Sequence, residues 1–136
     1  MRTDPAYRAS DEDGGTAAPL TVRFSHVRPS IGLCEVEGEV DVATAPWLRS
    51  QLHAALGHRP AHLIVDMCGI TFFSAAGLRV LRETSEECAG PRLALVERDG
   101  PVSHVLTMCG ASALFPQFRD LGGAVRAWDA RQDTLR

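Results

Sequence analysis

The chain has 136 residues, enough for one domain of ordinary size, and its apolar content of 45% predicts a packed core. Its net charge of −3 at pH 7 argues against nucleic-acid binding through a basic surface. No apolar run is long enough to cross a membrane, and the N-terminus lacks the apolar core of a signal segment. We therefore expect a soluble, cytoplasmic protein that binds neither nucleic acid nor membranes.

Residues 1–19 are acidic and show no apolar periodicity, so we expect a disordered N-terminal arm. Residues 20–25 alternate apolar and polar, residues 29–32 are typical of a turn, and residues 33–42 alternate again. This pattern predicts a strand hairpin with one face toward the core. On its second strand, the side chains expected to face solvent are Glu35, Glu37 and Glu39. Those expected to face the core are Cys34, Val36 and Val40.

A first helix is predicted to begin at Thr44 as N-cap, with Pro46 in its first turn, and to end at Gly57. Its apolar stripe is Leu48, Leu52, Ala55 and Leu56. Residues 62–67 follow, and their uniform apolarity predicts an interior strand covered on both faces.

Small residues within 70–78 then form a turn, and a second helix is expected to start at Ser74 and to stop at residues 90–91. Its inward side chains are expected to be Leu81, Thr84 and Cys88. The rest of the chain predicts a strand at 93–97, a helix over 102–109 closed by Gly110, an edge strand within 114–118 and a last helix starting at 123–128.

The predicted order is strand, strand, helix, strand, helix, strand, helix, strand, helix. Such alternation implies a largely parallel sheet, to which the opening hairpin adds an antiparallel edge. We expect a single α/β domain over residues 20–131, with a mixed four- to five-stranded sheet, helices packed mainly on one face, and a tail at 132–136.

Three stretches resemble a known family and together cover about residues 20–130. Residues 38–41 read Gly-Glu-Val-Asp and precede Thr44-Ala45, which is similar to the family's Gly-Glu-Leu-Asp…Thr-Ala. Residues 63–66, 69, 71–72 and 77–78 resemble the family's central strand and switch loop. Residues 101–110 and 114–115 resemble its third helix and last strand. On these motifs the chain is identified as a member of the STAS domain family, the module of bacterial anti-sigma factor antagonists and of sulfate-transporter tails.

The resemblance implies a switch that this chain lacks. In phosphorylatable family members the loop reads Asp-Ser-Ser/Thr-Gly, and an anti-sigma factor that is a histidine-kinase-like Ser/Thr kinase phosphorylates the serine after the Asp. Aligned on Gly77, the Asp position is Ser74, the phosphoserine position is Ala75 and the next is Ala76. Alanine has no hydroxyl, so the usual switch cannot operate at Ala75, and the surface keeps one electrostatic state.

The resemblance also implies a partner-binding surface, to which the sequence adds alternatives. Ser74 is either a displaced phosphorylation site or simply a helix N-cap, and we favour the cap. Asp41 either belongs to the surface or caps its own turn. Leu78 should point outward with Arg79 and Arg82 and form a docking patch. The expected partner-binding residues are Asp41, Thr44, Ser74, Ala75, Ala76, Gly77, Leu78, Arg79 and Arg82.

Nothing in the sequence predicts a metal, a cofactor or catalysis. The four cysteines form no CxxC pair and are expected to be reduced and mostly buried, and the five histidines show no HxH or HExxH spacing. Asp66 ends the interior strand without a nucleophile, a second base or a glycine-rich phosphate loop.

The expected function is therefore that of a non-enzymatic anti-sigma factor antagonist, which binds an anti-sigma factor and releases a sigma factor. The main alternative is a scaffold subunit of a sensory assembly that binds other STAS proteins. A small hydrolase or transferase is the least favoured hypothesis.

Overall fold

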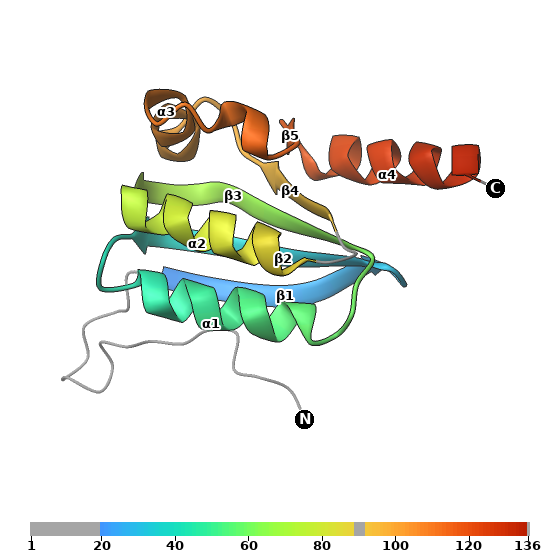
Figure 1. Ribbon diagram of the computed structural model, residues 1–136, viewed down its shortest axis with the longest axis horizontal. Coiled ribbons are helices and arrows are strands. Elements are labelled where there is room, and N and C mark those ends of the chain that lie inside the picture. Colours follow the sequence, from blue (N-terminus) through green and yellow to red (C-terminus); the bar gives the residue numbers. More distant parts are fainter. Residues whose placement is uncertain (1–19, 89–91, 136) are drawn as a thin grey trace.

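The computed structural model describes residues 20–88 and 92–135 of the chain (Figure 1). The predicted arm at 1–19 and the helix stop at 90–91 lie outside these ranges. The elements follow the predicted order: β1 (Leu20–Arg28), β2 (Ile31–Val40), α1 (Ala45–Leu56), β3 (His62–Phe73), α2 (Ala75–Glu87), β4 (Arg92–Val96), α3 (Pro101–Met108), a 3₁₀ turn η2 (Ser112–Leu114), β5 (Gln117–Phe118) and α4 (Leu121–Leu135).

The five strands form one mixed sheet in the order β1-β2-β3-β4-β5. β1 and β2 pair antiparallel, and every other neighbouring pair is parallel. β3 lies in the interior of the sheet, which confirms the prediction for residues 62–67. Leu63, Ile64 and Val65 are fully buried there, because helices cover both faces of this strand.

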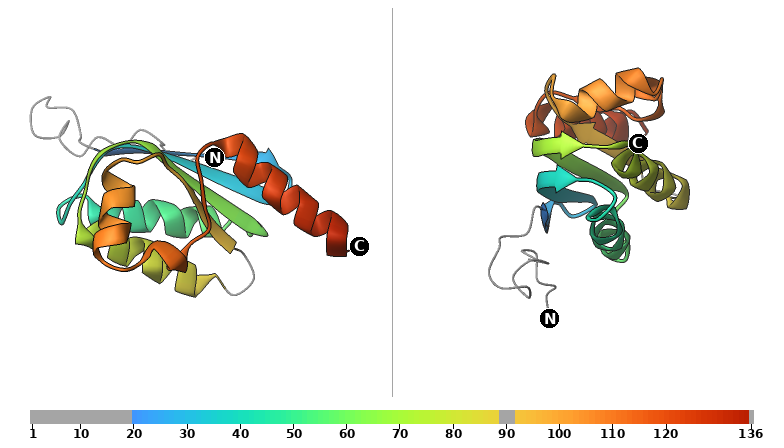
Figure 2. Two further views of the ribbon diagram at one scale, coloured as in Figure 1. Left: turned by 90° about the horizontal axis from the view of Figure 1, so that it is seen from above. Right: turned by 90° about the vertical axis from the view of Figure 1, so that its left-hand side faces the viewer.

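Three helices cover one face of the sheet and the fourth covers the other. The larger core contains buried side chains of α1, α2 and α3, among them Leu48, Leu81 and Leu106. On the opposite face Ile64 and Val96 pack with Trp128 of α4. Figure 2 shows α1 and α2 together on one side of the strands, while α4 extends past the end of the sheet.

The structure changes several predicted boundaries. β3 continues to Phe73, so residues 70–73, which were predicted to belong to a turn, are part of the strand. The edge strand shrinks to two residues, because residues 112–114 form a 3₁₀ turn instead. α4 starts at Leu121 and continues through residues 132–135, the segment that the sequence analysis placed in a tail.

The prediction of mostly buried thiols is wrong for two cysteines. Cys34 is buried and Cys88 is half-buried, but Cys68 and Cys109 are exposed, and all four are free. Cys109 follows the end of a short helix whose apolar stripe is filled by Val102 and Leu106, so its side chain is left outside the core.

Candidate functional site

The turn between β2 and α1 is held by its own side chains. Oδ1 of Asp41 accepts hydrogen bonds from the backbone N–H groups of Ala43 (2.9 Å) and Thr44 (3.0 Å). The Thr44 hydroxyl accepts one from the Asp41 N–H (3.0 Å) and donates to the Glu39 carbonyl (2.9 Å). Thr44 is thus the N-cap residue of α1 by position, but its hydroxyl stabilises the preceding turn and makes no hydrogen bond that caps the helix.

The start of α2 is fixed to this turn. Ser74 is the N-cap of the helix, and its Oγ accepts a hydrogen bond from the Ala76 N–H (3.2 Å), which confirms the N-cap interpretation. The Ser74 N–H donates to the carbonyl of Val40 (3.0 Å), the residue directly before Asp41. Two segments that lie more than 30 residues apart in the sequence therefore meet where β2 and β3 end.

A hollow of about 380 Å³ lies between the first turns of α1 and α2. Its lining is mainly small or apolar, with two arginines: Val42, Ala45, Pro46, Arg49, Ala75, Ala76 and Arg79. Ala75, which the sequence resemblance aligned with the family phosphoserine, is exposed and lies at this hollow. Val42 is 79% exposed and Phe72 is 50% exposed, which leaves apolar surface open to solvent at this edge of the molecule.

Two residues of the expected surface, Leu78 and Gly77, are buried against the sheet, in addition to Thr44 in its turn. Leu78 is only 6% exposed and belongs to the larger core, so the prediction that it points outward is wrong. Gly77 is buried as well, because α2 approaches the sheet closely there: a Cβ at this position would lie 2.5 Å from Cε1 of Phe73 and 2.8 Å from Cγ1 of Val40. Both residues position the helix, and neither offers a side chain to a partner.

The remaining expected residues divide by exposure. Ala75, Arg79 and Arg82 are exposed; Asp41, Ser74 and Ala76 are half-buried; Thr44 is buried in its turn. Sequence reasoning missed Val42, Pro46, Arg49 and Phe72. Val42 was predicted to end the strand over residues 33–42, whereas β2 ends at Val40 and leaves Val42 in the turn. The positions of Phe72 and Arg49 beside the hollow required the fold.

The groups whose pKa burial raises lie away from this hollow. Burial raises the pKa of the Cys34 thiol to about 12, and burial also raises the pKa of the Cys88 thiol and the Glu97 carboxyl; none of these groups lines the hollow. Within residues 20–88 and 92–135, no group of three His, Cys, Asp or Glu could hold a metal ion. In the same part of the chain, no helix is long and apolar enough to cross a membrane.

Comparison with known proteins shows where these features recur. Residues 25–124 match the model of the STAS domain. The anti-sigma-F factor antagonist RsfB of Mycobacterium tuberculosis is 24% identical over 96 residues, which are 70% of this chain and 79% of RsfB.

Solved structures share the fold. A crystal structure of an anti-sigma factor antagonist from Mycobacterium paratuberculosis is 25% identical, with a TM-score of 0.74 over 79% of this chain and 92% of that one. Unphosphorylated SpoIIAA, an anti-sigma factor antagonist, is 15% identical, with a TM-score of 0.62 over 80% of this chain and 97% of its own; at that identity it supports the fold alone. The family match spans most of the described domain, and this protein therefore belongs to the STAS domain family.

Proposed function

We propose that the protein is an anti-sigma factor antagonist, which binds an anti-sigma factor of the Ser/Thr kinase type and so releases a sigma factor. The observation that carries the proposal is the hollow where the Asp41 turn and the start of α2 meet. It places exposed Val42 and Ala75 side by side on one surface. The distant similarity to RsfB and to the mycobacterial antagonist structure supports the same function.

The two alanines of this surface set its regulation. A phosphoryl group at position 75 would add about −1.5 to −2 charges and would oppose an apolar contact by desolvation. Ala75 cannot accept one, and we propose that the Ser74 hydroxyl, which caps α2, is not a substitute site. The protein then acts as a permanently dephosphorylated, non-enzymatic antagonist in the cytoplasm.

The proposal is tested by direct binding. Each histidine-kinase-like anti-sigma factor encoded in the source genome is purified and titrated with the wild-type protein by calorimetry, and release of its sigma factor is followed by gel filtration. We expect one of them to bind and to lose its sigma factor. If none binds, or if only other STAS proteins bind, the scaffold alternative replaces this function.

A matched pair of variants locates the surface. Ala75→Glu adds a charge at the hollow, and Ala54→Glu adds the same charge at an exposed position near the other end of α1. We expect A75E to weaken binding at least about tenfold, a loss of about 1.4 kcal/mol, and A54E to bind like the wild type. Equal binding by both variants would place the partner elsewhere.

A further inference from the structure

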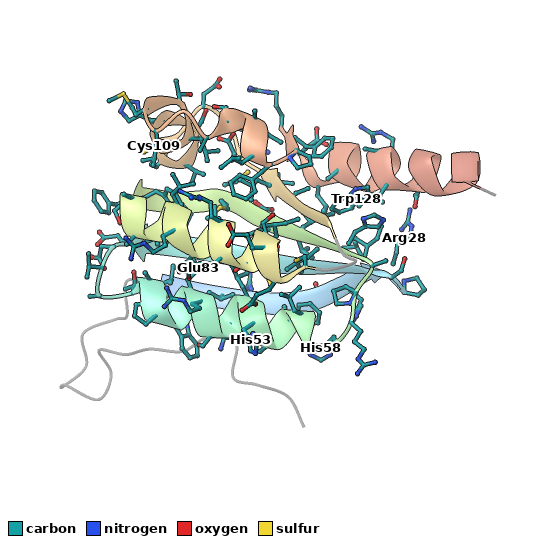
Figure 3. All side chains as sticks on the ribbon, viewed as in Figure 1. Arg28, His53, His58, Glu83, Cys109 and Trp128 are labelled. Atoms are coloured by element: carbon teal, nitrogen blue, oxygen red, sulfur yellow. The ribbon has the colours of Figure 1, made fainter. Side chains whose placement is uncertain are left out.

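A second and larger hollow, of about 750 Å³, runs along the other side of α2, between this helix and the segment from the end of α3 to η2. Cys109, Ala111 and the half-exposed Leu114 line one wall. Figure 3 shows Cys109 at the end of α3 and Glu83 on the side of α2 that faces α1, and both residues line this hollow.

The α2 wall carries four charged residues in a fixed order: Arg79, Arg82, Glu83 and Glu86. Positive charge therefore lies toward the start of the helix and negative charge toward its end. Residues four apart on a helix are neighbours, so Arg79 with Glu83 and Arg82 with Glu86 could pair within α2. Among the described residues the structure forms neither pair. Glu83 pairs instead with Arg49 of α1 (2.9 Å).

Three of the four charges are thus left for another molecule. Within the described part of the chain, Arg79, Arg82 and Glu86 form no ion pair, although all three are exposed. A partner that satisfies them must present acidic groups beside the start of α2 and a basic group beside its end.

A second copy of the same four charged residues, here called the α2 stripe, presents acidic and basic groups in these places when it is turned by 180°. When two copies of α2 lie antiparallel about a two-fold axis midway between residues 82 and 83, Arg79 of each faces Glu86 of the other, and Arg82 faces Glu83. Both pairs share one midpoint, so a single axis aligns all four contacts, which is the condition for a two-fold interface in which one patch meets itself. At an axial rise of about 1.5 Å per residue, the outer contacts lie about 10 Å apart.

We propose that this protein self-associates as an antiparallel dimer through the α2 stripe, with Leu114 of each copy at the apolar edge of the contact. The proposal does not rest on the function given above. Exposed ion pairs are individually weak, so the dimer is reversible and its formation is lowered by salt. Because Ala75 and Arg79 line both hollows, the dimer covers part of the surface at the start of α2.

Charge-swapped variants test the axis. The pair R79E/R82E makes the stripe wholly acidic, and E83R/E86R makes it wholly basic. We expect each variant alone to be monomeric in sedimentation velocity at concentrations from about 10 µM to about 1 mM, where the wild type becomes dimeric. An equimolar mixture of the two variants should form a heterodimer, because an acidic stripe then faces a basic one.

Controls separate the dimer from misfolding. R126E reverses an exposed arginine on α4 and should dimerise like the wild type. The fourfold change R79E/R82E/E83R/E86R restores self-complementarity with reversed signs and should dimerise alone, with thermal melting as the check on folding. A wild type that stays monomeric at about 1 mM and low salt, or double variants that dimerise alone as well as the wild type does, would overturn the proposal.

Discussion

At the residue scale, the small residues that open α2 have two separate roles. Gly77 is buried and lets the helix lie against Phe73 and Val40, whereas Ala75 is exposed and lies at the hollow. In sequence they look alike, because a run of Ser, Ala, Ala and Gly carries no sign of which member faces the sheet. Close packing against the sheet requires a glycine at position 77, and the proposed regulation depends on Ala75.

Gly77→Ala is expected to destabilise the fold even though alanine is the better helix former by about 1 kcal/mol. The new Cβ would lie 2.5 Å from a ring carbon of Phe73, and overpacking of this kind costs about 1–3 kcal/mol. Gly122→Ala in α4 is the control, because its Cβ would meet only the movable end of Arg126 at 3.0 Å. Chemical denaturation of both variants measures the difference, and a G77A variant as stable as G122A would show that the contact relaxes freely.

The family's phosphorylation pattern can be introduced with two changes. Ser74→Asp together with Ala75→Ser restores the family's local pattern, and the start of α2 tolerates a phosphoryl group beside its free N–H groups. Incubated with the bound kinase and ATP, this variant should gain one phosphate at position 75 and lose the partner, while the wild type gains none. Mass spectrometry decides, and stoichiometric phosphate on Ser74 of the wild type would show a switch displaced by one residue.

At the element scale, the junction between β4 and α3 holds a carboxylate in an unfavourable place. Glu97 is 8% exposed, and its Oε1 has no hydrogen-bond partner among the described residues. Burial is the main cause that raises its pKa, with a further contribution from the charge of Asp99 and an opposing one from Arg119. The folded state therefore disfavours the ionised form.

The sign of the pH dependence follows from this shift. A carboxyl whose pKa is raised on folding binds more protons in the native state, so its contribution to stability is greatest below its ordinary pKa and falls as pH rises through the raised value. Glu97→Gln cannot ionise, so it avoids the loss of stability that the wild type shows as pH rises. We expect E97Q to melt a few degrees above the wild type at about pH 7, for a gain of about 1 kcal/mol, and the gap to close toward about pH 4. A gap that is the same at both pH values would contradict this account.

At the scale of the whole molecule, different helices cover the two faces of the sheet. α1, α2 and α3 cover one face and shape both hollows, whereas α4 closes the other through Trp128, whose ring stacks on His62 at 4.2 Å. Figure 3 shows Trp128 between α4 and the strands, far from the labelled Cys109. We therefore expect a change on the α4 face to leave the proposed binding surface intact.

Trp128→Ala tests this separation. The side chain is 2% exposed, and its removal should lower the free energy of unfolding by about 3–5 kcal/mol. Well below its melting temperature, the variant should still bind the anti-sigma factor with wild-type affinity, as measured by calorimetry. A parallel loss of affinity in folded protein would mean that the second face also reaches the partner.

Local patterns of apolar residues were enough to predict the order of the elements, the interior place of β3 and the core-facing side of β2. The prediction that Ser74 is the N-cap of α2 also depended only on local sequence, and the structure confirms it. The family motifs also pointed to the region in which the hollow between α1 and α2 lies. These inferences needed no knowledge of which elements touch.

Only the tertiary structure decided which residues at the start of α2 are exposed. Leu78 is buried because α2 packs on the sheet with a wider apolar face than Leu81, Thr84 and Cys88 alone suggested. Val42 lies near Ala75 because a hydrogen bond from Ser74 to Val40 holds two distant segments together. Glu83 pairs with Arg49 of another helix rather than with Arg79 of its own. Exposure and pairing depend on contacts between elements, and a one-dimensional pattern does not contain those contacts.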